Sequence, residues 1–428
     1  MKRVLIISRY YLDLKDIASI RINGLTKFLP EFGWKPYILT SGSDSTGSFQ
    51  SRINVFEAPY EDKRIKWKRM LHLNEDQSLN EQFHVRTKKD KKSFGNYILN
   101  IWEEIFCYPD SVTSWRKPAV ELGRSIIERN LCDAMISSSG PPTCNLIAND
   151  LKEDYNLPWI ADFRDLWTQN HYNQFSRFRR FFERRLEIEA LSNADALTTV
   201  SEPLAEKLKD LHPSKNIFSI PNGFDPGQRN PGSPLEKRFT ITYTGALYRG
   251  RRDPEPLFQA LSSLISKGYL DPKDLSVDFY GHKEDWLEDD VKRYGLDGVV
   301  RINGSVSRDE SVEVQRRSHL LLLLTWNNKE ERGVYTGKLF DYLAAGRPIL
   351  SVGMSGGVVE DLLKATGAGF QPKTVQDIEQ IIMNAYNEYK SENTVAYNGI
   401  SSEIDKYSHI EMARKFASVL DDLVETKN

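Results

Sequence analysis

The sequence predicts an α/β protein built from two doubly wound parallel-sheet domains that face each other across a cleft. The chain has 428 residues, which is more than one hydrophobic core usually organises. Short apolar runs alternate with helical patterns in both halves, as in successive βαβ units. Between the halves, residues 224–237 are rich in proline and glycine and poor in apolar residues, which is typical of a linker.

The first half shows the strand–helix–strand alternation from the start of the chain. Residues 4–8 predict a strand, residues 17–32 a helix, and residues 36–41 the next strand. The same pattern then predicts strands at 134–137, 159–163, 196–200 and 217–220, with a helix at 143–155. The polar, basic stretch of residues 59–93 breaks the pattern, and we interpret it as a long excursion from the sheet.

After the linker the alternation restarts. Strands are predicted at 239–244, 276–280, 299–302, 319–325 and 348–352, and helices at 253–267 and 337–345. The last segment, residues 410–424, has apolar residues at helical spacing and predicts an amphipathic helix. In doubly wound domains ligands bind at the carboxyl ends of the strands, so the loops that follow these strands are the candidates for function.

Composition excludes several classes of protein. The 58 Lys and Arg residues nearly balance the 60 Asp and Glu residues, which argues against nucleic acid as a partner bound through bulk charge. The longest apolar run, residues 320–324, is far shorter than the roughly 20 residues that cross a bilayer, and the apolar run at the N-terminus is too short for a signal peptide. Cys107, Cys132 and Cys144 form no ligand pair, so we expect reduced thiols in a cytoplasmic protein, with peripheral membrane contact at most.

The segment of residues 330–350 is the most informative. An apolar strand leads through a polar loop into a helix that begins near Thr336 and Gly337. A helix N-terminus attracts anions, and Gly337 allows a ligand to approach the backbone. Lys338 in the first turn suits a diphosphate, and Asp341 on the same face suits ribose hydroxyls. The alternative is a capped surface helix with an ion pair between Lys338 and Asp341, and the spacing alone does not decide between them.

A second basic turn lies at residues 243–253. The strand ends at Gly245, and a loop with Arg249, Arg251 and Arg252 leads into the next helix. Arginine binds phosphate oxygens in bidentate fashion, so this order of elements suits a phosphate ligand. Taken alone, the arginines are compatible with a solvated loop. Their place beside Lys338, on a second strand-to-helix turn of the same sheet, favours a shared anion site.

These segments together resemble the family-4 glycosyltransferases, whose GT-B fold consists of two Rossmann-like domains facing each other across a cleft. The sequence KLFDYLAAGRPIL (338–350) is similar to the family's signature helix and following strand. IPNGFD (220–225) resembles its interdomain segment, and ADALTTVSEPLAEKL (194–208) the preceding strand and helix. DAMISSSGPPTCNLIA (133–148) and PWIADFRDLW (158–167) resemble one branch that builds cell-surface polysaccharides. The resemblance covers nearly the whole chain.

The resemblance implies how the chain is divided. It places an acceptor-binding domain at residues 1–225, a linker at 226–238, a donor-binding domain at 239–405, and a final helix at 406–428 that crosses back to the first domain. It also implies that Arg252 (or Arg249) and Lys338 bind the donor diphosphate, that Asp341 binds the ribose, and that the loop at Gly304 lies against the base. The remaining donor-side candidates are Gly245, Glu331, Gly333, Tyr335, Thr336 and Gly337.

The sequence departs from the family at three places. Where many members have an acidic residue that contacts the donor sugar, this chain has Gly333; either Glu331 or Glu330 replaces it through a shifted loop, or backbone N–H groups do. Where the family often has His followed by Asp, this chain has Arg164 and Asp165.

Arginine stays protonated and cannot act as a general base, so Asp162 and Asp165 are the catalytic carboxylate candidates beside Arg164. The alternative is a buried Arg–Asp network that shapes the floor of the cleft. The glycine-rich turn that the family has after its first strand is replaced here by residues 9–15. Arg21, Ser139 and Asn222 complete the acceptor-side candidates.

The expected function is therefore retaining transfer of a sugar from a nucleotide diphosphate sugar to a glycan or lipid-linked acceptor, in cell-surface polysaccharide biosynthesis. The sequence has no Asp-x-Asp motif after a strand and no grouped histidines, so we expect no metal and no cofactor, because Arg and Lys neutralise the leaving diphosphate. A nucleotide-sugar 2-epimerase of the same fold and a non-catalytic nucleotide-sugar-binding partner are the alternatives.

Residues 177–185 interleave arginines with phenylalanines, and residues 63–69 interleave basic residues with Trp67. Such segments suit an anionic membrane surface, where a lipid-diphosphate-linked acceptor would reside. The alternative is that the aromatic side chains pack on the core and the arginines pair with Glu183 and Glu187.

Overall fold

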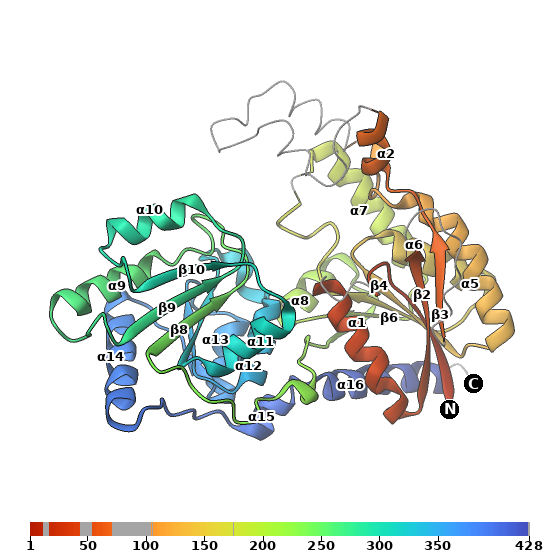
Figure 1. The fold of residues 1–428 in the computed structure, drawn as a ribbon. Helices are drawn as coiled ribbons and strands as arrows, with labels where there is room; N and C mark the ends of the chain where they lie inside the picture. Colours follow the sequence, from red (N-terminus) through yellow and green to blue (C-terminus); the bar gives the residue numbers. More distant parts are fainter. Residues whose placement is uncertain (12–16, 43–53, 71–103, 105, 174, 427–428) are drawn as a thin grey trace. The chain divides into compact units, whose positions relative to one another are not determined.

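The chain forms two compact units in the computed structural model (Figure 1). The first comprises Met1–Ile220 together with Ala413–Asn428, and the second comprises Pro221–Met412. The structure describes residues 1–11, 17–42, 54–70, 104, 106–173 and 175–426. Each unit contains one parallel sheet with helices on both faces, which confirms the predicted α/β fold class.

The first unit is organised by a seven-stranded sheet of order β3-β2-β1-β4-β5-β6-β7, in which every neighbouring pair is parallel. The strands are β1 Lys2–Ile7, β2 Trp34–Gly42, β3 Val55–Pro59, β4 Ala134–Ser139, β5 Trp159–Phe163, β6 Ala196–Thr199 and β7 Asn216–Ser219. Strands β5 and β6 are buried at every position, as expected for interior strands of a parallel sheet covered on both faces.

The helices of the first unit connect these strands. They are α1 Ile17–Phe28, α2 Lys63–Met70, α5 Arg116–Asn130, α6 Thr143–Tyr155, α7 Arg177–Leu191 and α8 Glu202–Leu211. The C-terminal helix α16, His409–Glu425, belongs to this unit from Ala413 onwards. Its Asp421 accepts hydrogen bonds from Lys2 Nζ (2.8 Å) and from Trp34 Nε1 (3.0 Å), and Phe416 is fully buried.

The second unit contains a six-stranded sheet of order β10-β9-β8-β11-β12-β13. Its strands are β8 Phe239–Thr244, β9 Leu275–Tyr280, β10 Val300–Gly304, β11 Leu320–Leu324, β12 Ile349–Val352 and β13 Gly369–Phe370. Its helices are α9 Glu255–Ser266, α10 Asp285–Arg293, α11 Arg308–Arg317, α12 Gly337–Ala345, α13 Val358–Thr366, α14 Val375–Glu392 and α15 Ser401–Asp405. The five leucines of β11 have no exposed surface, so this strand lies in the core.

The segment after Ile220 lies against the start of α16, within the second unit. Phe224 N donates to Tyr407 O (3.1 Å), and His409 N donates to Phe224 O (2.8 Å). A Cβ atom at Gly223 would lie 2.8 Å from the carbonyl carbon of Ser408. This close backbone approach explains the glycine in the IPNGFD segment.

Some predicted elements differ from the structure. The helix predicted over 17–32 is α-helical only to Phe28, and Leu29–Phe32 form a 3-10 turn that ends at Gly33, whose φ is +83°. Strand β3 was not predicted, because it is a five-residue edge strand next to a polar stretch. Of the predicted excursion over 59–93, residues 71–93 lie outside the described residues, as do residues 12–16 of the first loop. Among the described helices, none combines the length and apolar character needed to cross a bilayer.

Candidate functional site

Helix α12 of the second unit begins at a turn that leaves polar groups without partners. Thr336 is its N-cap residue, but the side chain makes no capping bond. The Thr336 hydroxyl is buried, and no described residue forms a hydrogen bond with it. Helix N-termini attract anions through their free N–H groups. An anionic ligand at this turn would supply the acceptor that the hydroxyl lacks.

Lys338, in the first turn of α12, is a partly buried cation that forms no ion pair with any carboxylate in the described part of the chain. Its Nζ donates to Tyr243 Oη (2.7 Å) and lies 3.9 Å from the centre of that ring. Burial lowers the pKa of Lys338 well below its usual value, and the nearby charge of Arg252 lowers it further, while Asp341 opposes both effects. A bound anion would therefore be strongly favoured beside this ammonium group.

Tyr243 connects Lys338 to the arginine loop. It is the fifth residue of β8, it is 1% exposed, and its hydroxyl donates to Ala246 O (2.7 Å). The chain of bonds from Lys338 through Tyr243 to Ala246 fixes the first turn of α12 relative to the start of the loop. Tyr243 was not predicted as a site residue, because a tyrosine inside an apolar strand is typical of a core residue.

Three glycines lie at the ends of β8, β9 and β10, where the absence of a side chain leaves space. Gly245, Gly281 and Gly304 have φ values of +121°, +154° and +83°, which L side chains rarely adopt. A Cβ atom at Gly245 would lie 2.7 Å from Lys338 Nζ, and one at Gly281 would lie 2.3 Å from Gly245 O. Gly245 and Gly304 were predicted as ligand-contacting positions, whereas Gly281 was missed because it lies in no recognisable motif.

Of the three loop arginines, Arg252 is the one that lies beside α12. Arg252 lines a small pocket with Glu331 and Thr336, so the structure brings these three candidates together. Arg249 instead lies over the ring of Trp286, a residue of α10, with 5.8 Å between its Cζ atom and the ring centre. The sequence left Arg252 and Arg249 open for the diphosphate, and this geometry favours Arg252.

Asp341 is held by a residue that the sequence analysis did not consider. Arg308, at the start of α11, donates through Nη2 to Asp341 Oδ1 (2.8 Å). Burial raises the pKa of Asp341, while Arg308 acts to lower it. No ion pair joins Lys338 to Asp341, although the structure describes both. The alternative of a surface helix with that pair is therefore wrong, because each side chain has a different partner.

The loop before α12 places the remaining donor-side candidates. Residues Lys329–Gly333 form a 3-10 turn in which Gly333 is buried. The Tyr335 ring packs against Phe340, with 5.6 Å between ring centres, so it supports the turn from the side of the core. Gly337 is the first residue of α12.

The first unit has a pocket of its own at the carboxyl ends of β4 and β5. Its lining includes the predicted residues Ser139, Arg164 and Asp165, together with Arg9 and Asp110, which were not predicted. Arg164 Nε donates to Asp165 Oδ2 (2.9 Å), and Asp165 is the more exposed of the two. Asp110 accepts a hydrogen bond from Thr143 N (2.8 Å), and burial raises its pKa.

Arg21 and Asp162 form a buried pair beneath this sheet end. Arg21 donates to both carboxylate oxygens of Asp162, at 2.9 and 2.8 Å, and Thr198 Oγ1 donates to the same carboxylate (2.8 Å). The exposed fractions are 2% for Arg21 and 0% for Asp162. Neither side chain can contact a substrate in this conformation. The alternative of a structural Arg–Asp network therefore describes them better than the predicted catalytic and acceptor contacts.

The last acceptor-side candidate is Asn222. It is partly buried and belongs to the second unit, not to the first-unit pocket that contains Ser139. Of the three predicted acceptor-side residues, Arg21 and Ser139 are thus in the first unit and Asn222 is in the second.

Comparison with known proteins gives a family match for one part of the chain and a fold match for the whole of it. Residues 93–228 match the model of Glycosyltransferase Family 4. This part of the chain is similar to the family 4 glycosyltransferases. The whole chain is similar to three solved structures that share its GT-B fold. They are a glycosyltransferase from Rickettsia africae (13% identity, TM-score 0.60, covering 99% of this chain and 98% of that one), HepE from Anabaena in complex with UDP (12%, 0.60, 99% and 100%), and a trehalose 6-phosphate synthase from Burkholderia multivorans (12%, 0.64, 100% of both). No curated protein sequence matches the chain.

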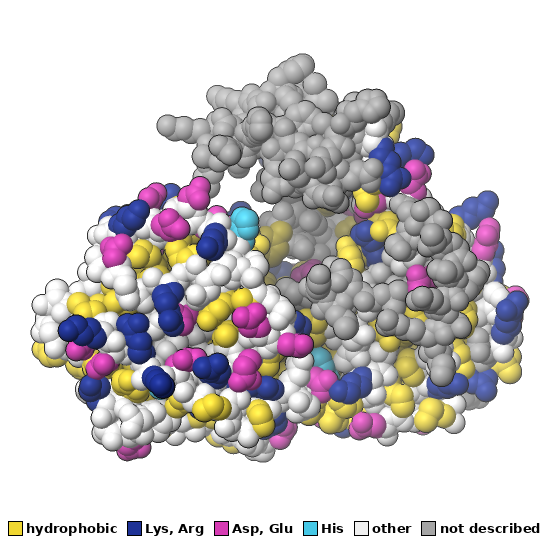
Figure 2. Space-filling view, in the orientation of Figure 1, with side chains coloured by type: hydrophobic (Ala, Val, Ile, Leu, Met, Phe, Trp, Pro, Cys, Tyr) yellow, Lys and Arg dark blue, Asp and Glu magenta, His cyan; other side chains and the backbone are white. Residues whose placement is uncertain are grey.

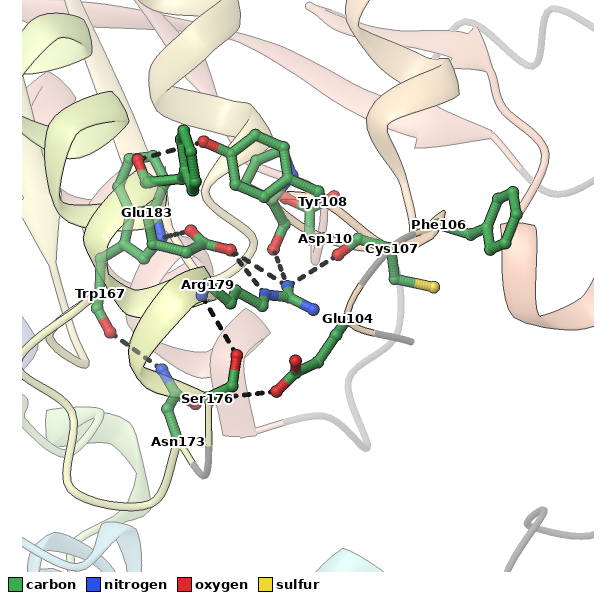
Figure 3. Close-up of polar contacts among 12 residues, drawn as sticks. Glu104, Phe106, Cys107, Tyr108, Asp110, Trp167, Asn173, Ser176, Arg179 and Glu183 are labelled. Atoms are coloured by element: carbon green, nitrogen blue, oxygen red, sulfur yellow. Dashed lines mark hydrogen bonds and ion pairs between the residues drawn. The ribbon is translucent and has the colours of Figure 1, made fainter. Parts of the chain in front are cut away.

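The structure of α7 corrects one expectation from the sequence. Arg179 was predicted as part of an exposed basic patch, but it is 7% exposed. Figure 3 shows its guanidinium group between Glu183 and the backbone of residues 107–109: Nε donates to Glu183 Oε1 (3.1 Å), and Nη2 donates to Cys107 O (2.8 Å) and Pro109 O (3.0 Å). Trp167 Nε1 donates to the other oxygen of Glu183 (2.7 Å). Arg179 is therefore a structural residue.

Among the described residues of the enzyme, no group of three or more His, Cys, Asp or Glu side chains is arranged to hold a metal ion. The three cysteines are buried and free. Burial raises the pKa values of Cys132 and Cys144 to about 12, so neither thiol is poised as a nucleophile.

Proposed function

We propose that this enzyme transfers a sugar, with retention of anomeric configuration, from a nucleotide diphosphate sugar to a glycan or lipid-linked acceptor in cell-surface polysaccharide biosynthesis. The observation that supports this most is Lys338, at the N-terminus of a helix: it is a partly buried cation that donates to a phenol and forms no ion pair with a described carboxylate. Such a site lacks an anion, and a diphosphate supplies one.

In this proposal the donor lies along the strand ends of the second unit. Lys338 and Arg252 bind the diphosphate, and the Thr336 hydroxyl and the first N–H groups of α12 donate to its oxygens. Asp341 accepts hydrogen bonds from the ribose hydroxyls while Arg308 holds it in place. Gly304 leaves room for the base at the end of β10. Further donor-side roles are proposed for Gly245 and Gly337, which admit the phosphates, and for Gly333 and Tyr335, which shape the turn.

The chemical step needs stabilisation of a leaving group more than a strong base. The bond from the anomeric carbon to the diphosphate oxygen breaks, and a bond to the acceptor oxygen forms on the same face. The acceptor proton passes to the departing phosphate oxygen. Lys338 and Arg252 stabilise the charge that develops on the diphosphate, which is electrostatic catalysis by preorganised groups. Glu331, which shares the pocket of Arg252, is the proposed contact to the donor sugar.

We place the acceptor in the first-unit pocket. Asp165 and Arg164 lie at its surface, and Ser139 forms part of its wall. In this proposal Asp165 accepts a hydrogen bond from an acceptor hydroxyl. Asp162 and Arg21 act as positioning residues, because they fix the end of β5 from below without reaching the pocket.

The test is release of nucleoside diphosphate. Purified enzyme is incubated with a panel of nucleotide sugars, with and without short soluble and lipid-linked glycans, after a thermal-shift screen with uridine, guanosine and adenosine diphosphates has selected the base. Transfer predicts release that accelerates with one class of acceptor. Conversion of the nucleotide sugar into its 2-epimer would replace this proposal with the epimerase alternative. Binding without turnover of any donor would leave the non-catalytic alternative.

A further inference from the structure

Helix α7 has its polarity inverted relative to an ordinary surface helix. The positions that face the core hold Arg179, Glu183 and Glu187, which are 7%, 0% and 0% exposed. The positions that face outward hold Phe178 and Phe181, which are 75% and 64% exposed. A helix on a globular protein normally buries its apolar stripe and exposes its charges, so this arrangement requires an explanation.

The buried charges fix the helix in this orientation. Glu183 bonds to both Arg179 and Trp167 Nε1, and Glu187 accepts a hydrogen bond from Thr168 N (3.0 Å). If α7 rotated to bury its phenylalanines, water would compete for these hydrogen bonds. The buried groups of the core that now pair with Glu183 and Glu187 would also lose their partners. Breaking a buried hydrogen-bonded pair is costly. The aromatic side chains are therefore held outward by the structure.

The outward side chains form a cluster on the surface. The rings of Phe178 and Phe182 meet edge to face with 4.8 Å between centres, and those of Phe181 and Phe182 with 5.4 Å. Phe182 is 42% exposed, and Ile188, further along the same side, is 44% exposed. Single exposed apolar residues are common, but a contiguous group of this kind marks an interaction surface.

The charge around this cluster indicates its partner. Four arginines on α7 are exposed and form no side-chain ion pair with a described residue: Arg177, Arg180, Arg184 and Arg185. Glu189 is the one exposed acidic residue of the helix. Aromatic side chains flanked by unpaired cations suit the headgroup region of an anionic bilayer, which attracts Lys and Arg and accepts aromatic rings at its surface.

A second basic helix is attached to the same stretch of chain. Lys63 of α2 donates from its backbone N to Ser111 O (3.0 Å) and from Nζ to Phe106 O (2.9 Å), while Arg179 of α7 binds Cys107 O and Pro109 O. Residues 106–111 therefore join the two helices. Basic side chains gather over α2 on the face shown in Figure 2, which extends the positive surface.

We propose that the outward face of α7 docks this enzyme on an anionic lipid bilayer. The docking face consists of Phe178, Phe181, Phe182 and Ile188 with Arg177, Arg180, Arg184 and Arg185. Arg179, Phe175 and Asn173, at and just before the first turn of α7, also line the first-unit pocket. Docking through α7 brings that pocket to the membrane surface, where a lipid-linked acceptor can place its head group while its lipid stays in the bilayer. This last step rests on the proposed function; the docking itself does not.

Vesicle flotation tests the docking. Full-length enzyme is mixed with vesicles of phosphatidylcholine alone or with about one third phosphatidylglycerol. Binding is expected only to the anionic vesicles, and it should fall steeply as salt is raised. Arg180→Gln with Arg184→Gln should weaken binding about 30-fold, from about 1 kcal/mol for each basic residue near the surface. The triple change of Phe178, Phe181 and Phe182 to Ser should weaken binding while leaving circular dichroism and melting unchanged, because these side chains are exposed.

The matched control is Arg124→Gln with Arg129→Gln on α5, which removes the same charge from exposed positions of the same unit and should leave vesicle binding unchanged. Equal losses in both double variants would mean that net charge alone binds the vesicle, and the assignment to α7 would be wrong. The proposal is also overturned if wild type stays unbound at low salt, or if the serine variant only converts a dimer to a monomer. Vesicle binding without transfer to any lipid-linked acceptor would instead contradict the proposed acceptor and leave the docking intact.

Discussion

Arg21 in the first unit and Lys338 in the second are both cations that the fold takes partly or wholly out of water, and they are held in opposite ways. Arg21 is 2% exposed and donates two hydrogen bonds to one carboxylate, Asp162, which is itself fully buried. Lys338 is only partly buried, its hydrogen-bond partner is the neutral Tyr243, and the nearby Arg252 repels it.

This difference distinguishes cations that stabilise the fold from a cation that is available to bind a ligand. A cation that is matched by a carboxylate leaves no charge for a ligand to compensate, so Arg21 serves the fold. A cation that is desolvated and faces a phenol has a lowered pKa, and an anionic ligand restores its charged form. Arg179 behaves like Arg21, because Glu183 and two carbonyl groups surround it.

The largest expected effect comes from breaking the matched pair. Asp162→Ala should lower the free energy of unfolding by about 3–5 kcal/mol, because it leaves the Arg21 guanidinium buried without a partner. Urea unfolding followed by tryptophan fluorescence measures this loss. The double variant Arg21→Leu with Asp162→Leu removes both charges and should lose much less. Equal losses in the single and double variants would contradict the view that charge pairing holds this site.

Removing the charge of Lys338, which has no matching carboxylate among the described residues, should affect catalysis and leave the fold unchanged. Lys338→Met and Arg252→Ala should each lower kcat/KM by about 100-fold or more, the scale of losing one preorganised charge contact, with melting temperatures close to wild type. Arg249→Ala is the matched control, since Arg249 lies over Trp286, and its activity should stay within a fewfold of wild type. A larger loss for Arg249→Ala than for Arg252→Ala would reassign the phosphate contact.

A smaller effect is expected for a substitution of Thr336, which should maintain or slightly raise stability but lower the affinity for nucleotide. Thr336→Val replaces a buried hydroxyl that has no partner among the described residues, so stability should stay the same or rise slightly. Affinity for the nucleoside diphosphate should fall about tenfold or more, because a hydrogen bond to a charged group is lost. Thermal shift with and without nucleotide measures both quantities. A loss of stability with unchanged affinity would show that Thr336 caps the helix and does not bind the ligand.

The smallest expected effect is that of a chelator. If Lys338 and Arg252 neutralise the leaving diphosphate, activity should be unchanged in excess EDTA. Initial rates of nucleoside diphosphate release test this directly. Complete loss of activity that magnesium or manganese restores would mean that the two side chains do not suffice.

The sequence predicted the parts of the fold and site that follow from local pattern. The helix over 337–345 and the strand over 239–244 agree with the structure, because apolar periodicity is a local property. The resemblance to family 4 supplied what spacing could not, namely which of many loops to propose as the donor site.

The residues that the sequence missed depend on tertiary neighbours. Tyr243 lies inside an apolar strand, and only its 2.7 Å contact with Lys338 shows its role. Arg308 reaches Asp341 from another helix, 33 residues away in the chain. On α7, interleaved Arg and Phe predicted a two-sided helix but not which side is buried. The acids at Glu183 and Glu187, four and eight residues after Arg179, were the available evidence that the charged side faces the core.

The most direct test of the central claim is calorimetric titration of a nucleoside diphosphate into wild type and Lys338→Met, in two buffers of different ionisation enthalpy. Lys338 has a lowered pKa in the free enzyme, and a bound diphosphate raises it, so binding should take up protons at a pH between these two values and weaken as pH rises through that window. Wild type is expected to take up protons on binding, whereas Lys338→Met should bind about tenfold more weakly or not at all, without proton uptake. Equal affinities and no difference between buffers would contradict it.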